Sequence, residues 1–309
     1  MDVMTVTGPI EPRVLGHVQP HEHVLIDMTL APYRWDYDGH LTDVSIATQE
    51  LSAFRDAGGV TLVDVTTPDL GRDPEGLVEA SEGSGVQIVM GTGWYREPYY
   101  PPSIDRTSTF ELTVQLIAEI TDGVGPHSVR PGIIGEIGTD KAWMSAMEER
   151  VFRASARAHK ETGLAIMTHT PPGAATSHLA LLDEEGVDLG RVAVGHADGS
   201  LDGDYHRAIL DAGAFASFDL IGQGAHPDEW CAEHIAHLVE LGYADQILLS
   251  SDICKRSRLR AWGGEGYPYV LRRFLPRLRE VGLSAATIWQ LTVGNPARLL
   301  ADARLSPPS

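Results

Sequence analysis

Eight short apolar segments rich in β-branched residues recur along the chain, and they constrain its fold more than any other feature. They occupy residues 14–26, 59–68, 86–93, 131–138, 163–170, 191–198, 214–222 and 246–253. Longer segments with the spacing of amphipathic helices separate them, for example 148–162, which is followed by Gly163 as a typical helix C-cap. Strands that alternate with crossover helices in this way run parallel.

Eight buried parallel strands with helices between them predict an α/β protein with a single (β/α)8 TIM barrel, a fold that usually takes about 250 residues. The length of 309 residues and the hydrophobic content of 43% fit one barrel domain over 1–309, with a polar tail at 302–309. A doubly wound sheet is the alternative. It has less support, because no Gly-x-Gly-x-x-Gly follows a first strand.

Acidic residues outnumber basic ones, 43 to 24, and give a formal net charge of -19. This charge opposes non-specific binding to nucleic acid and to anionic membranes. The N-terminal segment has no basic stretch before an apolar one, and no apolar run approaches the roughly 18 residues of a spanning helix. We therefore expect a cytoplasmic protein with a small-molecule substrate, and a homodimer remains open. The two cysteines, Cys231 and Cys254, are expected to be buried thiols.

Candidate metal ligands stand at the ends of five strands. Alternate side chains of a strand share a face, so His21 and His23 in the first segment point together. The fourth, fifth, sixth and eighth segments end on Glu136, His169, His196 and Asp252. A lone histidine at a strand end is more often a hydrogen-bonded core residue than a ligand. The set changes this balance, because four of the chain's 13 histidines lie at strand ends beside two carboxylates. This grouping favours a shared metal site.

Six nitrogen and oxygen ligands exceed the three or four of one catalytic zinc, so we expect two divalent ions bridged by a carboxylate and a hydroxide. Glu136, central in strand order, is the expected bridge. Ions about 3.5–4 Å apart lower the pKa of a shared water and polarise a carbonyl or phosphoryl oxygen. This chemistry predicts hydrolysis, in which Asp252 would hold one ion and act as general base.

Two other functions compete with hydrolysis. A metal-dependent sugar isomerase could use the same barrel, but four imidazoles suit zinc-like ions better than magnesium or manganese. A non-catalytic, metal-stabilised binding protein is the other alternative. The presence of Asp252 beside an unsaturated two-metal centre argues against it.

Several short motifs resemble the phosphotriesterase family of the amidohydrolase superfamily. In chain order they are PHEH, GIIGEIGT, THT, GHAD, SSDIC, RLRAWGGEGYPY and GNPARLL. The resemblance spans nearly the whole chain and implies a hydrolase with two metal ions per chain, commonly zinc, with Mn2+, Co2+ or Fe2+ as alternatives. It also implies that His21, His23 and Asp252 hold one ion and that His169 and His196 hold the other.

Glu136 departs from the family pattern. Phosphotriesterases and the related lactonases carry a carboxylated lysine at the end of the fourth strand, whereas a glutamate resembles the phosphotriesterase-homology and phosphotriesterase-related branch. An encoded carboxylate needs no CO2, so metal alone should restore activity to the metal-free protein. We expect a lactone, carboxylic ester or amide as substrate, with an organophosphate-hydrolysing phosphotriesterase as the alternative.

Two loops rich in Pro and Gly, residues 91–103 and 251–268, follow the third and eighth strands on the face where such barrels bind substrate. Trp94 and Tyr95 would form a wall of the pocket, unless Trp94 only packs its loop against the barrel. One of the four cations of KRSRLR could bind a substrate oxyanion, and Arg258 is the candidate chosen among Lys255, Arg256, Arg258 and Arg260. A solvated or salt-bridged loop is the alternative.

Two further polar residues accompany the strand ends. Asp198, two residues after His196, would either orient a histidine or cap a helix. His17 shares the strand parity of His21 but lies about 13 Å further back, so we expect it to pack in the core or at the barrel floor and not to bind metal.

Overall fold

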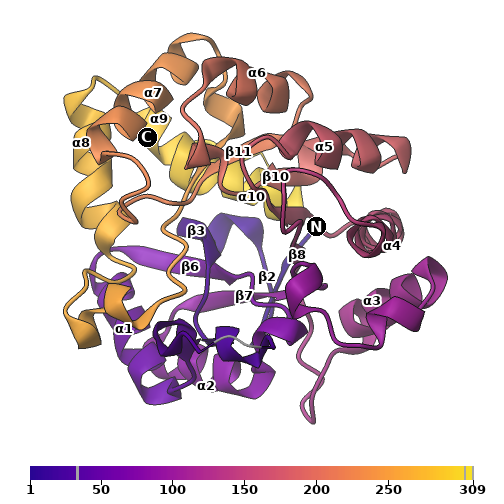
Figure 1. The fold of residues 1–309 in the computed structure, drawn as a ribbon. Helices are drawn as coiled ribbons and strands as arrows, with labels where there is room; N and C mark the ends of the chain where they lie inside the picture. The colour runs from indigo at the N-terminus through magenta and orange to yellow at the C-terminus, as the bar shows by residue number, and fades with distance from the viewer. Residues whose placement is uncertain (33–34, 303, 308–309) are drawn as a thin grey trace.

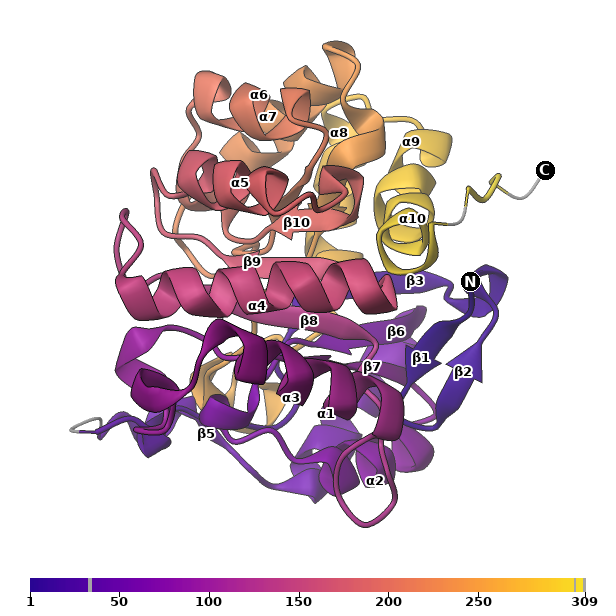
Figure 2. The same cartoon turned by 90° about the vertical axis from the view of Figure 1, so that its right-hand side faces the viewer.

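Eight parallel strands form one sheet in the computed structural model, which describes residues 1–32, 35–302 and 304–307. The strands follow one another around the sheet in chain order. Their bounds are β3 His17–Glu22, β6 Gly59–Asp64, β7 Gln87–Thr92, β8 Ile133–Gly138, β9 Ile166–His169, β10 Val192–Val194, β11 Phe215–Phe218 and β12 Ile247–Leu249. Each strand lies within one of the eight predicted segments. The predicted (β/α)8 barrel is therefore confirmed, with helices surrounding the strands in Figures 1 and 2.

Ten α-helices are present in the described part of the chain. Their bounds are α1 Val44–Asp56, α2 Pro74–Ser84, α3 Thr109–Asp122, α4 Ala146–Thr162, α5 Ala175–Glu184, α6 Gly203–Asp211, α7 Asp228–Glu240, α8 Leu275–Glu280, α9 Ala285–Trp289 and α10 Asn295–Ala301. Helix α4 ends at Gly163 as predicted, in a left-handed conformation with φ of 75°. It begins two residues earlier than predicted, because Ser145 and Glu148 form a capping box.

The core has two layers. Apolar side chains that alternate along the strands fill the barrel interior, among them Val18, Val63, Val89, Met167, Phe215 and Leu248. The opposite faces of the strands pack against the helices, as with Ile134, Val151 and Phe152. This double burial explains why the strand segments read as nearly continuous apolar runs.

Smaller elements complete the fold. Strands β1 Val3–Thr5 and β2 Gly8–Ile10 form an antiparallel hairpin, and β4 Ile26–Asp27 pairs with β5 His40–Leu41. Cys231 is buried, but Cys254 is only half-buried because it lies in the loop after β12. Part of the polar tail expected at 302–309, namely 303 and 308–309, lies outside the described residues.

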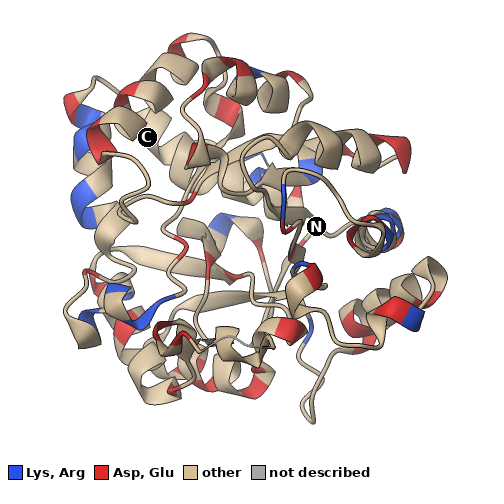
Figure 3. Ribbon diagram, in the orientation of Figure 1, with Lys and Arg blue, Asp and Glu red and all other residues tan. Residues whose placement is uncertain are grey.

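Charged residues of both signs are distributed over the outer helices, with a group of cations at α8 (Figure 3). No helix among the described residues is both long enough and apolar enough to cross a membrane.

Candidate metal centre

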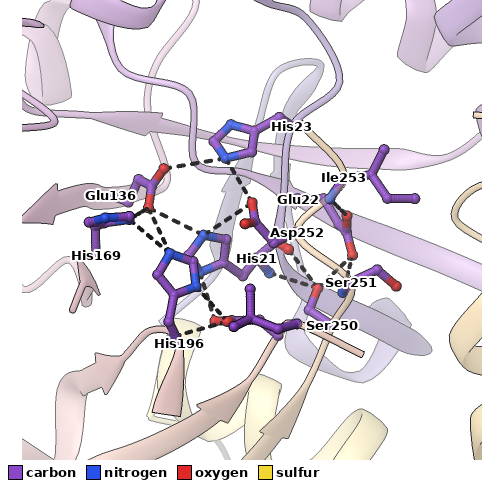
Figure 4. Close-up of polar contacts among 12 residues, drawn as sticks. His21, Glu22, His23, Glu136, His169, His196, Ser250, Ser251, Asp252 and Ile253 are labelled. Atoms are coloured by element: carbon purple, nitrogen blue, oxygen red, sulfur yellow. Dashed lines mark hydrogen bonds and ion pairs between the residues drawn. The ribbon is translucent and has the colours of Figure 1, made fainter. Parts of the chain in front are cut away.

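Six side chains that the sequence nominates as metal ligands converge at the C-terminal ends of the strands (Figure 4). They are His21, His23, Glu136, His169, His196 and Asp252. Neighbouring polar atoms of the six lie 2.8 to 3.9 Å apart. The structure thus brings together residues that are spread over more than two hundred positions of the chain.

Glu136 lies at the centre of the group and is 2% exposed. Its Oε1 is 3.3 Å from Nε2 of His23, and its Oε2 is 3.4 Å from Nε2 of His21. The same Oε2 is 3.3 Å from Nδ1 of His169 and 3.9 Å from Nε2 of His196. One carboxylate therefore faces four imidazoles from three parts of the barrel, which is the arrangement a bridging ligand requires.

Asp252 approaches the same centre from the other end of the sheet. Its Oδ1 is 3.2 Å from Nε2 of His23 and 3.8 Å from Nε2 of His21. Asp252 and His196 both have positive φ, 45° and 55° respectively, a left-handed conformation that residues other than glycine seldom adopt. Such strain persists where the surroundings fix the backbone, and it concentrates at functional sites.

Polar partners at the outer nitrogens orient three of the four imidazoles. Asp219 places Oδ2 2.9 Å from Nδ1 of His21 and Oδ1 2.8 Å from Nδ1 of His196. Thr66 Oγ1 lies 2.9 Å from Nδ1 of His23. In each ring the remaining nitrogen, Nε2, faces the centre, as in metal sites where an acceptor fixes the tautomer of the ligand.

Asp198 does not contact a histidine directly. Its carboxylate accepts hydrogen bonds from the backbone N–H groups of Asp219 and Leu220, at 3.2 and 2.9 Å. The expectation that Asp198 caps a helix is wrong, because Asp202 is the N-cap of α6. Asp198 instead fixes the main chain of Asp219, the residue that orients His21 and His196.

The donor set fits divalent metal. Among the described residues, His21 Nε2 and Glu136 Oε2 are buried and have no hydrogen-bond partner of good geometry. Nε2 of His196 lies 2.8 Å from Nδ1 of His169, so two ring nitrogens face each other at the carboxylate. Imidazole nitrogens with carboxylate oxygens suit zinc and similar first-row ions.

Without an ion, the buried charges shift the pKa values of the cluster in opposite directions. Burial favours neutral His23, but hydrogen bonds to Asp252 and Glu136 outweigh it and raise its pKa to about 10. Burial likewise lowers the pKa of His196, yet Asp219 raises it to about 9. Burial lowers the pKa of His169 to about 4. Burial would raise the pKa of Glu136, but hydrogen bonds from His169 and the other imidazoles hold it well below its usual value. The carboxylates thus attract positive charge to the place where metal would bind.

Tyr95 and Trp94, both proposed from the sequence as substrate contacts, lie in different surroundings. The Tyr95 hydroxyl is 3.2 Å from Nδ1 of His169, and the two rings pack edge to face with centroids 4.7 Å apart. Trp94 is buried in the core cluster that includes Ile104 and Leu112. Trp94 therefore packs its loop against the barrel, whereas Tyr95 lies at the edge of the metal-ligand cluster.

Arg258 ties two loops together. Its guanidinium donates to the carbonyl oxygens of Gly222 and Gln223, at 3.1 and 2.8 Å. It lines a cavity of about 280 Å³ with Ser251 and Ile253, and none of the six clustered residues lines that cavity.

Three carboxylates next to the candidate ligands were not singled out in the sequence. Asp64 is the last residue of β6, and Asp219 directly follows β11, so both stand at strand ends like the ligands. Asp64 accepts from the N–H groups of Val24 and Thr66, at 2.7 and 2.9 Å, and so fixes the turn after His23. Glu22, the third, carries no signal beyond its place between two histidines.

The fold and the cluster together define a hydrolase barrel of the amidohydrolase type. The model of the phosphotriesterase family matches residues 1–300, and the chain belongs to this family. The family is dependent on binuclear metal centres, and it includes lactonases and N-acetyltaurine hydrolases.

Several relatives cover almost the whole chain. The phosphotriesterase homology protein of Escherichia coli is 34% identical over 92% of this chain and 97% of its own sequence. Its crystal structure, with phosphate in the active site, matches with a TM-score of 0.90 over 93% of this chain and 99% of the other. The lactonase Lmo2620 from Listeria monocytogenes is 29% identical, with a TM-score of 0.91 over 98% and 100% of the two chains. N-acetyltaurine hydrolase of Dictyostelium discoideum is 31% identical over 89% of this chain and 79% of its own.

Proposed function

We propose that this chain hydrolyses a lactone, a carboxylic ester or an N-acyl amide with two divalent metal ions, most readily zinc. His21, His23 and Asp252 would hold one ion, His169 and His196 the other, and Glu136 would lie between them. The observation that carries the proposal is Glu136, whose two oxygens face four imidazole nitrogens at 3.3 to 3.9 Å in a buried site.

When bound, the ions would supply a water that is acidic near neutral pH and would polarise the carbonyl oxygen of the substrate. The chain's own residues then handle orientation and proton transfer. Asp252, with a side chain 15% exposed against 3% for Glu136, is the carboxylate that can accept the proton lost by the attacking water. The same carboxyl group would return this proton to the departing alkoxide or amine.

We favour carbonyl substrates over organophosphates for two reasons, the names of the relatives and the glutamate at position 136. Relatives at similar identity bear the names lactonase and N-acetyltaurine hydrolase, which describe the hydrolysis of a cyclic ester and of an N-acyl amide. We propose that organophosphate turnover is weak. The relatives named as hydrolases favour hydrolysis over the isomerase. We propose that the enzyme acts in the cytoplasm on a small molecule.

We propose Tyr95 as a substrate contact, because its hydroxyl lies beside His169 at the edge of the centre. Trp94 would support that wall from the core. Arg258 would act on an anionic part of the substrate only from the 280 Å³ cavity between the loops that follow β11 and β12. Turnover of anionic and neutral lactones by Arg258→Ala distinguishes this role from loop bracing, since an unchanged preference counts against substrate binding.

A combined metal and substrate measurement tests the proposal. Protein purified without chelator is analysed for metal, and the same preparation is assayed with lactones, aryl esters, N-acyl amides and phosphotriesters. Glu136→Gln is the matched variant, since it keeps the shape of the side chain and removes its charge. We expect it to lose at least one ion and nearly all turnover. Full metal content and activity in Glu136→Gln would contradict the proposed bridge.

A further inference from the structure

Strands β3 and β12 are the two ends of the eight-stranded sheet, and no backbone ladder joins them. The barrel closes at this seam by other means. The proposed ligands of the first ion lie on its two sides, His21 and His23 after β3 and Asp252 after β12. What holds the seam together therefore also sets the distance between these ligands.

The carboxylate of Glu22 takes the place of the missing ladder. Its Oε1 accepts from Ser251 N–H at 2.6 Å, and its Oε2 accepts from Ile253 N–H at 2.8 Å. Ser250 Oγ and Gln19 Nε2 also donate to Oε1, at 2.8 and 3.0 Å. Figure 4 shows Glu22 turned away from the centre, toward these groups.

Asp252 lies between the two N–H groups that Glu22 accepts. Its own N–H donates to the carbonyl oxygen of His21 at 3.2 Å, so residues 21 and 22 receive three successive N–H groups of the β12 end. On the opposite side, Gln223 Nε2 donates to the carbonyl oxygens of Ser251 and Asp252, at 2.6 and 3.2 Å. This grip fixes the left-handed backbone of Asp252, whose φ is 45°.

We propose that Glu22 is a positioning residue for Asp252: it holds the Asp252 backbone in the strained conformation that directs the carboxylate toward His21 and His23. This inference rests on the proposed function, because it assigns Asp252 to one ion. Glu22 is fully buried and faces away from the candidate ligands, so it acts through the backbone of residues 251–253.

Two substitutions separate the parts of this grip. In Glu22→Gln the amide oxygen can keep the donors of Oε1, but the amide NH2 would face the N–H of Ile253, so one of the two bracketing bonds is lost. Glu22→Ala removes all four hydrogen bonds. The matched control is Glu50→Gln, another buried glutamate, whose Oε1 accepts from Ala261 N–H at 2.8 Å in the same loop but nine residues beyond Asp252.

Zinc affinity is the primary readout, measured on metal-free protein by competition with a chelator, at about pH 8 because burial raises the pKa of Glu22 to about 7. Loss of a supporting partner typically costs 10- to 100-fold in metal affinity. We expect the ion that Asp252 would hold to bind about 10-fold more weakly in Glu22→Gln and about 100-fold more weakly in Glu22→Ala. The affinity for the other ion, and the affinities of Glu50→Gln for both ions, should stay within about twofold of the wild-type values. In the zinc-loaded enzyme, kcat should fall while KM changes little, because Asp252 acts on a proton rather than on substrate binding.

Three results would overturn the proposal. Both Glu22 variants could keep the wild-type affinity for two ions, or lose both ions to the same extent, or lower only the melting temperature, as a purely structural seam would. If Glu22→Ala does not fold, Ser250→Ala replaces it, because this change removes one donor to Glu22 and the contact of that hydroxyl with His21. Failure of the proposed function looks different, since wild-type protein would then bind fewer than two ions.

Discussion

Asp219 offers a sharp test of the two-ion assignment, because it holds one proposed ligand of each ion. Its two oxygens lie 2.9 Å from Nδ1 of His21 and 2.8 Å from Nδ1 of His196. Asparagine has nearly the same shape but only one acceptor oxygen. In Asp219→Asn one imidazole therefore keeps a weaker, neutral hydrogen bond, and the other faces an NH2 group.

The expected loss follows from these contacts. Removal of an outer partner costs 10- to 100-fold in metal affinity, and tenfold corresponds to about 1.4 kcal/mol. We assign about tenfold to the ion whose histidine keeps a hydrogen bond and about 100-fold to the other, which amounts to about 4 kcal/mol over both ions. Thr66→Val removes the hydroxyl contact to His23, together with the side-chain hydrogen bond of Thr66 to Asp64, and should weaken one ion by about tenfold.

Calorimetric titration of metal-free protein with zinc measures both steps in each variant. Asp219→Asn should weaken both steps, Thr66→Val one, and Glu50→Gln neither. If Asp219→Asn weakens a single step, His21 and His196 do not belong to different ions. Unchanged affinities in Asp219→Asn would refute the reasoning that this carboxylate orients the ligands.

Two other predictions address the bridge and His17, the buried histidine at the start of β3 whose ring lies near Phe54 of α1. Metal-free protein should regain full activity with zinc in buffer depleted of CO2, because Glu136 is an encoded carboxylate, and a strict bicarbonate requirement would refute this. Burial lowers the pKa of His17 from 6.5 to about 4, so the unfolded state binds more protons between these values and the free energy of unfolding falls as pH drops through them. This contributes about 3 kcal/mol at most, and His17→Gln should flatten the acid dependence of metal-free protein in denaturant titrations. An equally steep dependence in His17→Gln would show that other groups cause it.

The barrel could be predicted because buried parallel strands leave a signal at each of their residues. All eight segments contain a strand, and the end of α4 at Gly163 follows from a local glycine signal. The start of α4 was placed too late, because a capping box at Ser145 extends the helix beyond its apolar face.

The candidate ligands could be nominated for a similar reason, since strand ends of a barrel share one face. The sequence does not show which strand-end carboxylates would orient imidazoles and which would bind metal. Glu136 and Asp219 occupy equivalent positions in sequence, and only the side-chain distances show that one faces four imidazoles and the other holds two from behind. The role of Glu22 depends on the closure between β3 and β12, which brings together residues about 230 positions apart.

The number of metal ions per chain tests the central claim most directly. Elemental analysis of protein purified without chelator, together with hydrolysis assays on the same sample, should give close to two ions per chain and turnover that disappears on chelation and returns with added metal. Fewer than one tightly bound ion per chain, with no gain of activity on addition of zinc, manganese, cobalt or iron, would contradict the account.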